Sequence, residues 1–272
     1  MFLAIAGSPD EEERQMNGYL TELVEGTEFD QRLRAAGFLA DLAIGSSKRN
    51  QTTIGENPGI AKALLDLLTG PGDADARSEA ARCMRNLCHH HPENRHRLGQ
   101  DEGIFTALLS LLPEGGSDRA RAEGMRTLWH LSRDSEDNKT AAGRTKGLFQ
   151  HLVEALQHGP VLQAESIHLL LCLSYKHPEN QSRIGNTPGI FQGLVEIMSD
   201  AGNLQVAGRA DAARLLRNLA YHHPRNRDRI GETPDVFHAL ADLLCEPDAA
   251  GRATAARALR DLCYNNATNQ AR

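Results

Sequence analysis

The chain has 272 residues, a formal net charge of −6, 40% hydrophobic residues and 4% aromatic residues. Net acidity argues against a general nucleic-acid-binding protein, which usually carries an excess of Lys and Arg. The apolar content is sufficient for a core of packed helices, and no apolar run reaches the roughly 18–20 residues that a membrane-spanning helix needs.

The N-terminal residues do not resemble a targeting signal. The stretch MFLAIA is apolar but short, has no basic residue before it and leads directly into SPDEEE, so it is not a signal peptide. We expect residues 1–14 to be a polar lead-in. The five cysteines fall inside helical patterns without paired spacing (Cys83, Cys88, Cys172, Cys245, Cys263). Together these features indicate a reducing compartment, the cytoplasm, with the nucleus as a second location.

One recurring segment organises the rest of the chain. It reads HPENRHRLGQDEGIFTALLSLL from His91, returns from His177 and from His223, and has weaker copies at Asn50 and Asn138. Its asparagine recurs at intervals of 42 to 46 residues (Asn50, Asn94, Asn138, Asn180, Asn226, Asn269). An all-helical repeat of about 40–47 residues is the period of an α-solenoid. The sequence therefore predicts an all-α solenoid.

The repeats divide residues 15–272 into six units and the start of a seventh. We place them at 15–49, 50–93, 94–137, 138–179, 180–225 and 226–268, with an incomplete unit from Asn269. The first unit lacks the short first helix of the others. Because the array stops within a repeat, we expect either a longer protein or self-association through the C-terminal repeat, where Ala256, Leu259 and Leu262 would face an absent neighbour.

Each full repeat carries the signals of three helices. The short first helix ends at a glycine, the usual helix-ending residue (Gly55, Gly99, Gly143, Gly185, Gly231). The second helix has an apolar face and is expected to be capped at its N-terminus by a polar side chain (Asn57, Asp101, Thr145, Thr187, Thr233). Loops rich in Gly, Pro and Asp lead to a long third helix.

The third helices carry polar residues at positions i, i+3, i+4 and i+7, which share one face of a helix. We call this set the third-helix ladder. Its five rungs are Arg82, Arg85, Asn86 and His89; Arg126, Trp129, His130 and Arg133; His168, Leu171, Cys172 and Tyr175; Arg214, Arg217, Asn218 and Tyr221; and Arg257, Arg260, Asp261 and Tyr264. Arginine forms two-pronged contacts with carboxylates, and Tyr and Trp are common interface anchors. The ladder is therefore the candidate partner-binding surface.

A solvated surface without a ligand is the alternative interpretation of the ladder. An acidic residue lies three positions before three of the arginines, which allows ion pairs within one helix (Glu79 before Arg82, Glu123 before Arg126, Asp211 before Arg214). Arg85, Arg217 and Arg260 have no acidic residue three or four positions earlier. These three arginines are the better candidates for binding.

Histidines and cysteines raise the question of a metal site or a catalytic site. The histidines recur at helix ends, where the helix dipole favours them, and no further ligand completes a metal site (His89, His90, His91, His177, His222, His223). Cys172 and His168 share the ladder, but nothing orients the histidine or supplies an oxyanion site. The glycine-rich GPG and GG segments follow helices rather than strands, so we expect no phosphate-binding loop. We predict no metal, no cofactor and no enzymatic activity.

The motifs resemble those of the armadillo repeat family. The pattern Asn-x-x-x-Ile-Gly before the second helix, MRNL at Met84–Leu87 and LRNL at Leu216–Leu219 are similar to motifs of that family. The resemblance covers about residues 15–272 and implies a right-handed superhelix of three-helix repeats whose third helices line a concave groove. The position of the family's groove asparagine is occupied by Asp41, Asn86, His130, Cys172, Asn218 and Asp261.

One departure from the family pattern shapes the expected function. Nuclear-import receptors of this fold carry tryptophan four residues before the groove asparagine, whereas this chain has arginine at four of the six positions (Gly37, Arg82, Arg126, His168, Arg214, Arg257). Those arginines would repel a basic cargo. We expect a non-enzymatic scaffold that binds an extended or helical acidic segment of a protein partner along the ladder.

Two other functional classes stay open at this point. Analogy with the armadillo family allows a regulatory cofactor, such as a nucleotide exchange factor for a GTPase or a chaperone. Nucleic-acid binding is the third class, and it would weaken steeply with salt. The identity of the partner and the oligomeric state do not follow from the sequence.

Overall fold

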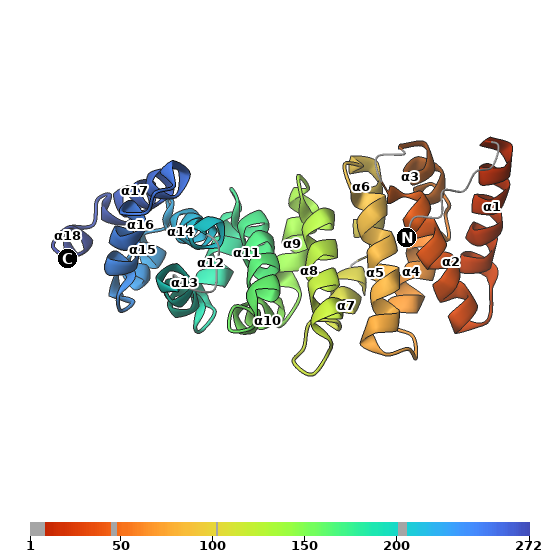
Figure 1. Cartoon of the computed structure of the whole chain (residues 1–272), viewed down its shortest axis with the longest axis horizontal. Coiled ribbons are helices and arrows are strands. Elements are labelled where there is room, and N and C mark those ends of the chain that lie inside the picture. The colour runs from red at the N-terminus through yellow and green to blue at the C-terminus, as the bar shows by residue number, and fades with distance from the viewer. Residues whose placement is uncertain (1–8, 45–47, 102, 201–205) are drawn as a thin grey trace. The chain divides into compact units, whose positions relative to one another are not determined.

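The protein is all-α in the part of the chain that its structure describes. This computed structural model describes residues 9–44, 48–101, 103–200 and 206–272, and it contains eighteen helices and no strand there (Figure 1). The predicted all-α fold is thereby confirmed. Within the same residues, no helix combines the length and the hydrophobicity required to cross a bilayer.

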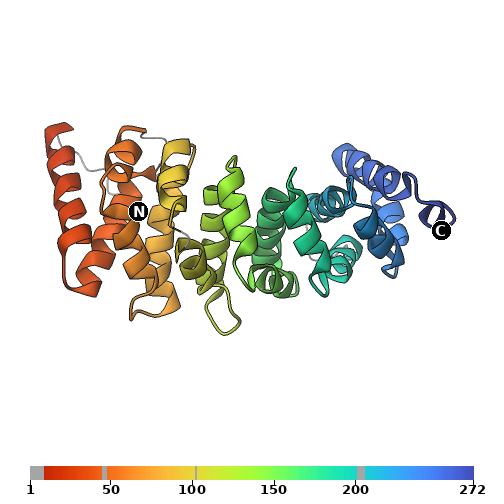
Figure 2. The same ribbon diagram turned by 180° about the vertical axis from the view of Figure 1, so that it is seen from behind.

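The helices form two compact parts, residues 1–138 and 139–272. The N-terminal part contains α1 (Pro9–Glu25), α2 (Phe29–Leu42), α3 (Lys48–Gly55), α4 (Ile60–Leu68), α5 (Ala74–Cys88), α6 (Pro92–Gly99), α7 (Gly103–Leu109) and α8 (Asp118–Ser132). Its third helices α2, α5 and α8 pack side by side, and α1 lies along α2 in both views (Figures 1 and 2). The boundary between the two parts falls within α9 (Glu136–Arg144).

The C-terminal part repeats the same order of helices. It contains α10 (Leu148–Ala155), α11 (Pro160–Ser174), α12 (Pro178–Asn186), α13 (Ile190–Ser199), α14 (Val206–Ala220), α15 (Pro224–Glu232), α16 (Val236–Leu244), α17 (Ala249–Cys263) and α18 (Ala267–Gln270). Its third helices α11, α14 and α17 also pack side by side. That the repeats of both parts form one continuous solenoid stays a prediction.

The recurring asparagine and glycine form a contact between successive first helices. Asn94 donates its side-chain N–H groups to the carbonyl oxygens of Gln51 and Leu87, at 2.8 and 2.9 Å. Its Oδ1 lies 2.0 Å from the place where a Cβ on Gly55 would be. The same arrangement recurs at Asn138, Asn180, Asn226 and Asn269. These glycines have negative φ, so the approach of the next asparagine, and not a left-handed helix end, requires them.

Helix α1 supplies what the first repeat lacks. It begins at Pro9, so residues 9–14 are helical, although the sequence suggested a lead-in. Acidic residues in its first turn favour this start, because negative charge is stabilising at a helix N-terminus. One of them, Glu12, accepts a hydrogen bond at 3.0 Å from the side chain of Asn50. A carboxylate thus replaces the main-chain acceptor that a preceding first helix provides elsewhere.

The histidines before the first helices are N-caps. Nδ1 of His91 accepts the backbone N–H of Asn94 at 3.3 Å, and its Nε2 lies 2.9 Å from the hydroxyl of Thr52. Both contacts recur at His177 and His223, with distances between 2.8 and 3.2 Å. An accepting Nδ1 requires a neutral ring that carries its proton on Nε2. In the described part of the chain, no group of three or more His, Cys, Asp or Glu side chains could hold a metal ion.

The expected caps of the second helices divide into two kinds. Asn57 and Asp101 each accept the backbone N–H two residues later, at 2.9 Å. Thr145, Thr187 and Thr233 instead donate their hydroxyls to the carbonyl four residues earlier, at 2.9–3.0 Å. The prediction that the threonines cap the second helices is therefore wrong. A threonine hydroxyl can bond back to the helix that it follows, and here it does so.

The inner face of α17 differs from expectation at one residue. Leu262 is fully buried, whereas Leu259 is half-buried and Ala256 is exposed. Leu262 occupies the same repeat position as Leu87, Leu131, Leu173 and Leu219, all of which have no exposed surface. Leu262 therefore belongs to the core of its own repeat and is buried without a following repeat.

Candidate functional site

In the N-terminal part, the first ladder arginines are neutralised by carboxylates. Arg82 lies 2.5 Å from the Asp41 carboxylate of α2 and 2.8 Å from Glu79 of its own helix. Arg85 Nε lies 2.5 Å from the carboxylate of Glu123 on α8. The sequence favoured Arg85 as a binding residue because no acid lies three or four positions before it, but its carboxylate partner comes from the next repeat.

The groove asparagines differ between the two parts. Asn86 is buried, and its side-chain N–H donates to the carbonyl oxygen of Ala40 at 2.9 Å, so it holds α5 against α2. Asn218 on α14 is half-buried, and its amide forms no hydrogen bond among the described residues. Of the two, only Asn218 has an amide that is available to a ligand.

The next rung brings aromatic and basic groups together at the ends of α5 and α8. The rings of Trp129 and His130 meet edge to face with centroids 4.6 Å apart, and the His89 ring lies 5.2 Å from that of His130. The Arg133 guanidinium lies 5.2 Å from the centre of the Trp129 ring. We call His89, Trp129, His130 and Arg133 the N-terminal cluster. Arg126, one turn before His130, is half-buried.

In the C-terminal part, arginines of the ladder remain available. Arg217 is half-buried and Arg257 is exposed, and neither guanidinium has an ion pair or a hydrogen bond within the described ranges. Arg214 lies 3.0 Å from Asp211, and Arg260 lies 2.7 Å from Asp261. These two arginine side chains are 50% and 68% exposed, so both guanidinium groups remain accessible to solvent although each has a carboxylate partner.

Three exposed tyrosines follow the third helices of the same part. They are 53%, 54% and 63% exposed and occupy the same place at the ends of α11, α14 and α17 (Tyr175, Tyr221, Tyr264). The residue after each tyrosine has positive φ and turns the chain sharply towards the next first helix (Lys176, His222, Asn265). The tyrosines therefore occupy one repeated position. Two lysine ammonium groups lie 5.4 and 5.8 Å from the Tyr175 ring, and the His222 ring lies 4.1 Å from that of Tyr221.

The remaining rung on α11 is less basic. His168 Nε2 lies 3.6 Å from a carboxylate oxygen of Asp211, and the hydrogen bond to Asp211 raises the pKa of His168. Leu171 and Cys172 on the same helix are half-buried. The rung therefore adds one imidazole that a neighbouring carboxylate favours in its charged form.

Sequence comparisons find no match, whereas comparison of structures finds proteins of similar fold. No protein-family model matches the sequence, and no curated protein is detectably similar to it. Computationally designed armadillo repeat proteins for modular peptide recognition align with a TM-score of 0.78 over 90% of this chain and 99% of theirs, at 14% identity. A designed armadillo repeat protein in complex with the peptide (KR)4 aligns with a TM-score of 0.74 over 91% and 98%, at 16% identity. The chain has an armadillo-like repeat fold.

A third similar structure is described only as an engineered protein of the Northeast Structural Genomics Consortium. It aligns with a TM-score of 0.76 over 91% of this chain and 96% of its own, at 22% identity. At such identities the likeness concerns the armadillo fold alone. The side chains of the ladder have to be interpreted from their own geometry.

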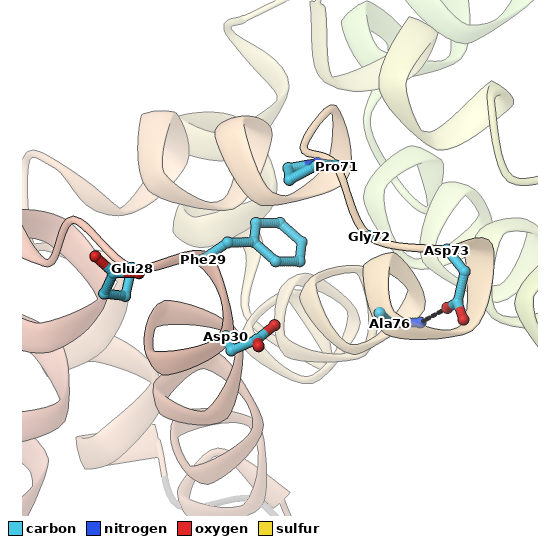
Figure 3. A pocket seen from close by; sticks show the side chains of 7 residues that line it. All are labelled: Glu28, Phe29, Asp30, Pro71, Gly72, Asp73 and Ala76. Atoms are coloured by element: carbon cyan, nitrogen blue, oxygen red, sulfur yellow. Dashed lines mark hydrogen bonds between the residues drawn. The ribbon is translucent and has the colours of Figure 1, made fainter.

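A separate pocket of about 430 Å³ in the N-terminal part is explained by packing (Figure 3). Its lining includes Phe29 and the Pro71–Gly72 turn, and the Phe29 ring points towards that turn. A Cβ on Gly70 or Gly72 would lie 2.4 or 2.8 Å from the ring. The GPG sequence of this armadillo repeat is therefore a cradle for an aromatic side chain.

The contacts that sequence inspection missed lie between repeats. The acids that pair with Arg82 and Arg85 across helices, Asp41 and Glu123, are 41 and 38 residues away in the chain. A search restricted to one helix cannot find them. Stacking the armadillo repeats by their asparagines and comparing positions about one period apart would have indicated both pairs.

Proposed function

We propose that this protein is a non-enzymatic peptide-binding scaffold whose C-terminal ladder takes an extended acidic segment of a protein partner. The observation that carries the proposal is that Arg217 and Arg257, on adjacent third helices, have no ion pair or hydrogen bond with any residue that the structure describes. Asn218 and the exposed tyrosines at the ends of the same helices complete the surface.

The charge of the ladder supports an acidic peptide. Guanidinium groups bind carboxylates through two parallel hydrogen bonds, and hydrogen bonds to charged groups are worth about 1.5–3 kcal/mol each. The exposed rings of Tyr221 and Tyr264 offer contact area with few rotatable bonds, as interface tyrosines commonly do. One of the designed armadillo proteins of similar fold is described in complex with a basic peptide. The arginines of this chain favour a peptide of the opposite charge.

The test is a binding titration with two labelled peptides, (DE)4 and (KR)4. Fluorescence anisotropy should detect saturable binding of (DE)4 and none of (KR)4. Reversing both arginines (Arg217→Glu with Arg257→Glu) should weaken (DE)4 binding by about a hundredfold, because two charge-assisted contacts become repulsive. Arg85→Glu is unsuited to this test, since it would leave Glu123 beside another carboxylate.

Arg225→Glu is the matched control. Arg225 is exposed on α15 and is not a ladder residue, and Arg225→Glu changes the net charge by the same amount per substitution as the ladder variant, which has two substitutions. The control should bind (DE)4 nearly as well as the unchanged protein, and circular dichroism should give equal helicity for all variants. Equal loss of binding in the control and in the ladder variant would mean that overall charge causes the effect, and it would contradict the proposal that the ladder binds the peptide.

A further inference from the structure

The N-terminal cluster contains hydrogen-bonding groups without partners. In the portion of the chain that the structure describes, no ring nitrogen of His89 or His130 forms a hydrogen bond. Both rings are half-buried and lie 5.2 Å apart, between Trp129 and the end of α5. Two imidazoles are therefore held side by side with donor and acceptor positions open.

Positive charge is in excess around these rings. Three arginines surround them and meet two carboxylates: Glu123 pairs with Arg85, and Asp134 lies 3.5 Å from Arg133 Nε and 3.4 Å from Arg95 Nη1. Burial, and then the cations His89, Arg85, Arg133 and Arg95, lower the pKa of His130 to about 3. Among the described residues, no carboxylate compensates the charge of a protonated His130, so the cluster can accommodate an anion.

We propose that the N-terminal cluster binds a phosphate monoester group carried by a phosphorylated peptide. Such a group has close to two negative charges and three strong acceptor oxygens at neutral pH. Its oxygens can accept from His89, His130 and Arg133, which approach from two helix ends. A carboxylate has one charge and two oxygens and leaves one donor unused. The Trp129 ring beside the donors packs against the peptide that carries the phosphate.

Binding of the phosphate is linked to uptake of a proton. His130 is neutral at pH 7 because it is partly buried and because its surroundings are cationic, and the added anion offsets the second of these causes. Its pKa rises on binding, so the complex holds more protons than the free protein. Affinity for the phosphopeptide should therefore increase as pH falls from 8 to 6.5, a range in which the phosphate keeps most of its charge.

The chain contains one tryptophan, so the fluorescence of Trp129 reports on the cluster directly. The probe is a capped Gly-Ala-phosphoserine-Ala-Gly peptide, compared with its serine and glutamate counterparts and with inorganic phosphate. A saturable fluorescence change is expected with the phosphopeptide, and binding of the other three should be at least about tenfold weaker. Because Trp129 is the one tryptophan and belongs to the N-terminal cluster, its fluorescence reports binding there, whereas binding of the phosphate by arginines of the C-terminal ladder would leave it unchanged.

Two pairs of variants complete the experiment. Arg133→Gln should weaken phosphopeptide binding about tenfold, whereas Arg225→Gln on α15 should not. His130→Asn, a residue that two other repeats carry at this position, should abolish the pH dependence, whereas His238→Asn, at a side chain 80% exposed, should keep it. Equal binding of the serine and phosphoserine peptides, equal affinity for free phosphate, or a pH dependence that survives in His130→Asn would each overturn the proposal.

Discussion

At the scale of single residues, the contact between an asparagine and a glycine of the preceding repeat is the most demanding feature of the chain. The asparagine satisfies two main-chain carbonyls, and its Oδ1 fills the space in which any Cβ would have to lie. Sequence inspection located both residues through their period, but assigned the glycine to a helix end. The true cause is a side chain 39 residues later, which a local pattern cannot indicate.

Replacing this glycine should destabilise the protein. Gly55→Ala places a methyl group 2.0 Å from Asn94 Oδ1, so the free energy of unfolding in urea should fall by roughly 1–3 kcal/mol, the usual cost of overpacking. Gly18→Ala is the matched control, because Gly18 lies on the exposed side of α1 with nothing within 4 Å of a new Cβ. That control should gain about 0.5–1 kcal/mol. A similar change in both variants would contradict the packing explanation.

At the scale of elements, the caps decide how each first helix begins. His91 accepts an N–H through Nδ1, and burial lowers its pKa even though the Glu93 carboxylate, 3.2 Å away, raises it. The neutral ring is therefore the folded form. The last repeat uses Asn266 at the same position, where it accepts the N–H of Asn269 at 3.0 Å. Asparagine is thus a cap of equal geometry that does not titrate.

The cap makes stability depend on pH. A lowered folded-state pKa means that the contribution of His91 is fully present above its unfolded value of 6.5 and is lost as pH falls through the folded value. His130, with a pKa of about 3, acts in the same direction. The free energy of unfolding should therefore decrease from pH 7.5 to pH 5, and His91→Asn should make that decrease smaller while leaving stability at pH 7.5 nearly unchanged. Identical slopes for the variant and the unchanged protein would exclude the cap as a source.

At the scale of the whole molecule, the positions of the helices could be predicted from the sequence more completely than the ion pairs of the surface. The asparagine period indicated where each first helix lies, and the apolar spacing indicated the second and third helices. The ion pairs of the surface were harder to predict, because the carboxylate partners of the ladder arginines, such as Asp41 and Glu123, belong to other repeats. The same holds for the start of α1, which is favoured by the bond between Glu12 and Asn50.

Because the main contacts of each described helix are with helices of its own and adjacent repeats, damage should remain local. In Gly55→Ala, amide hydrogen exchange should accelerate in α3 to α6, whereas α14 to α17 should exchange at the rate of the unchanged protein. Mass spectrometry of peptic fragments resolves these regions. A uniform acceleration along the whole chain would indicate that the protein unfolds as one cooperative body and would contradict the prediction.

The contact between asparagine and glycine has a consequence for how such a chain can change its length. Asn94, Asn138, Asn180, Asn226 and Asn269 each contact the equivalent glycine of the preceding repeat, so this contact does not depend on which two repeats it connects. Removal of residues 94–137 would bring Asn138 onto Gly55 with the bonding groups in register. A gene segment that encodes one period can thus be duplicated or lost while the asparagine–glycine contact between successive repeats is kept. What distinguishes one repeat from another is then the set of ion pairs and surface residues, which differ between repeats.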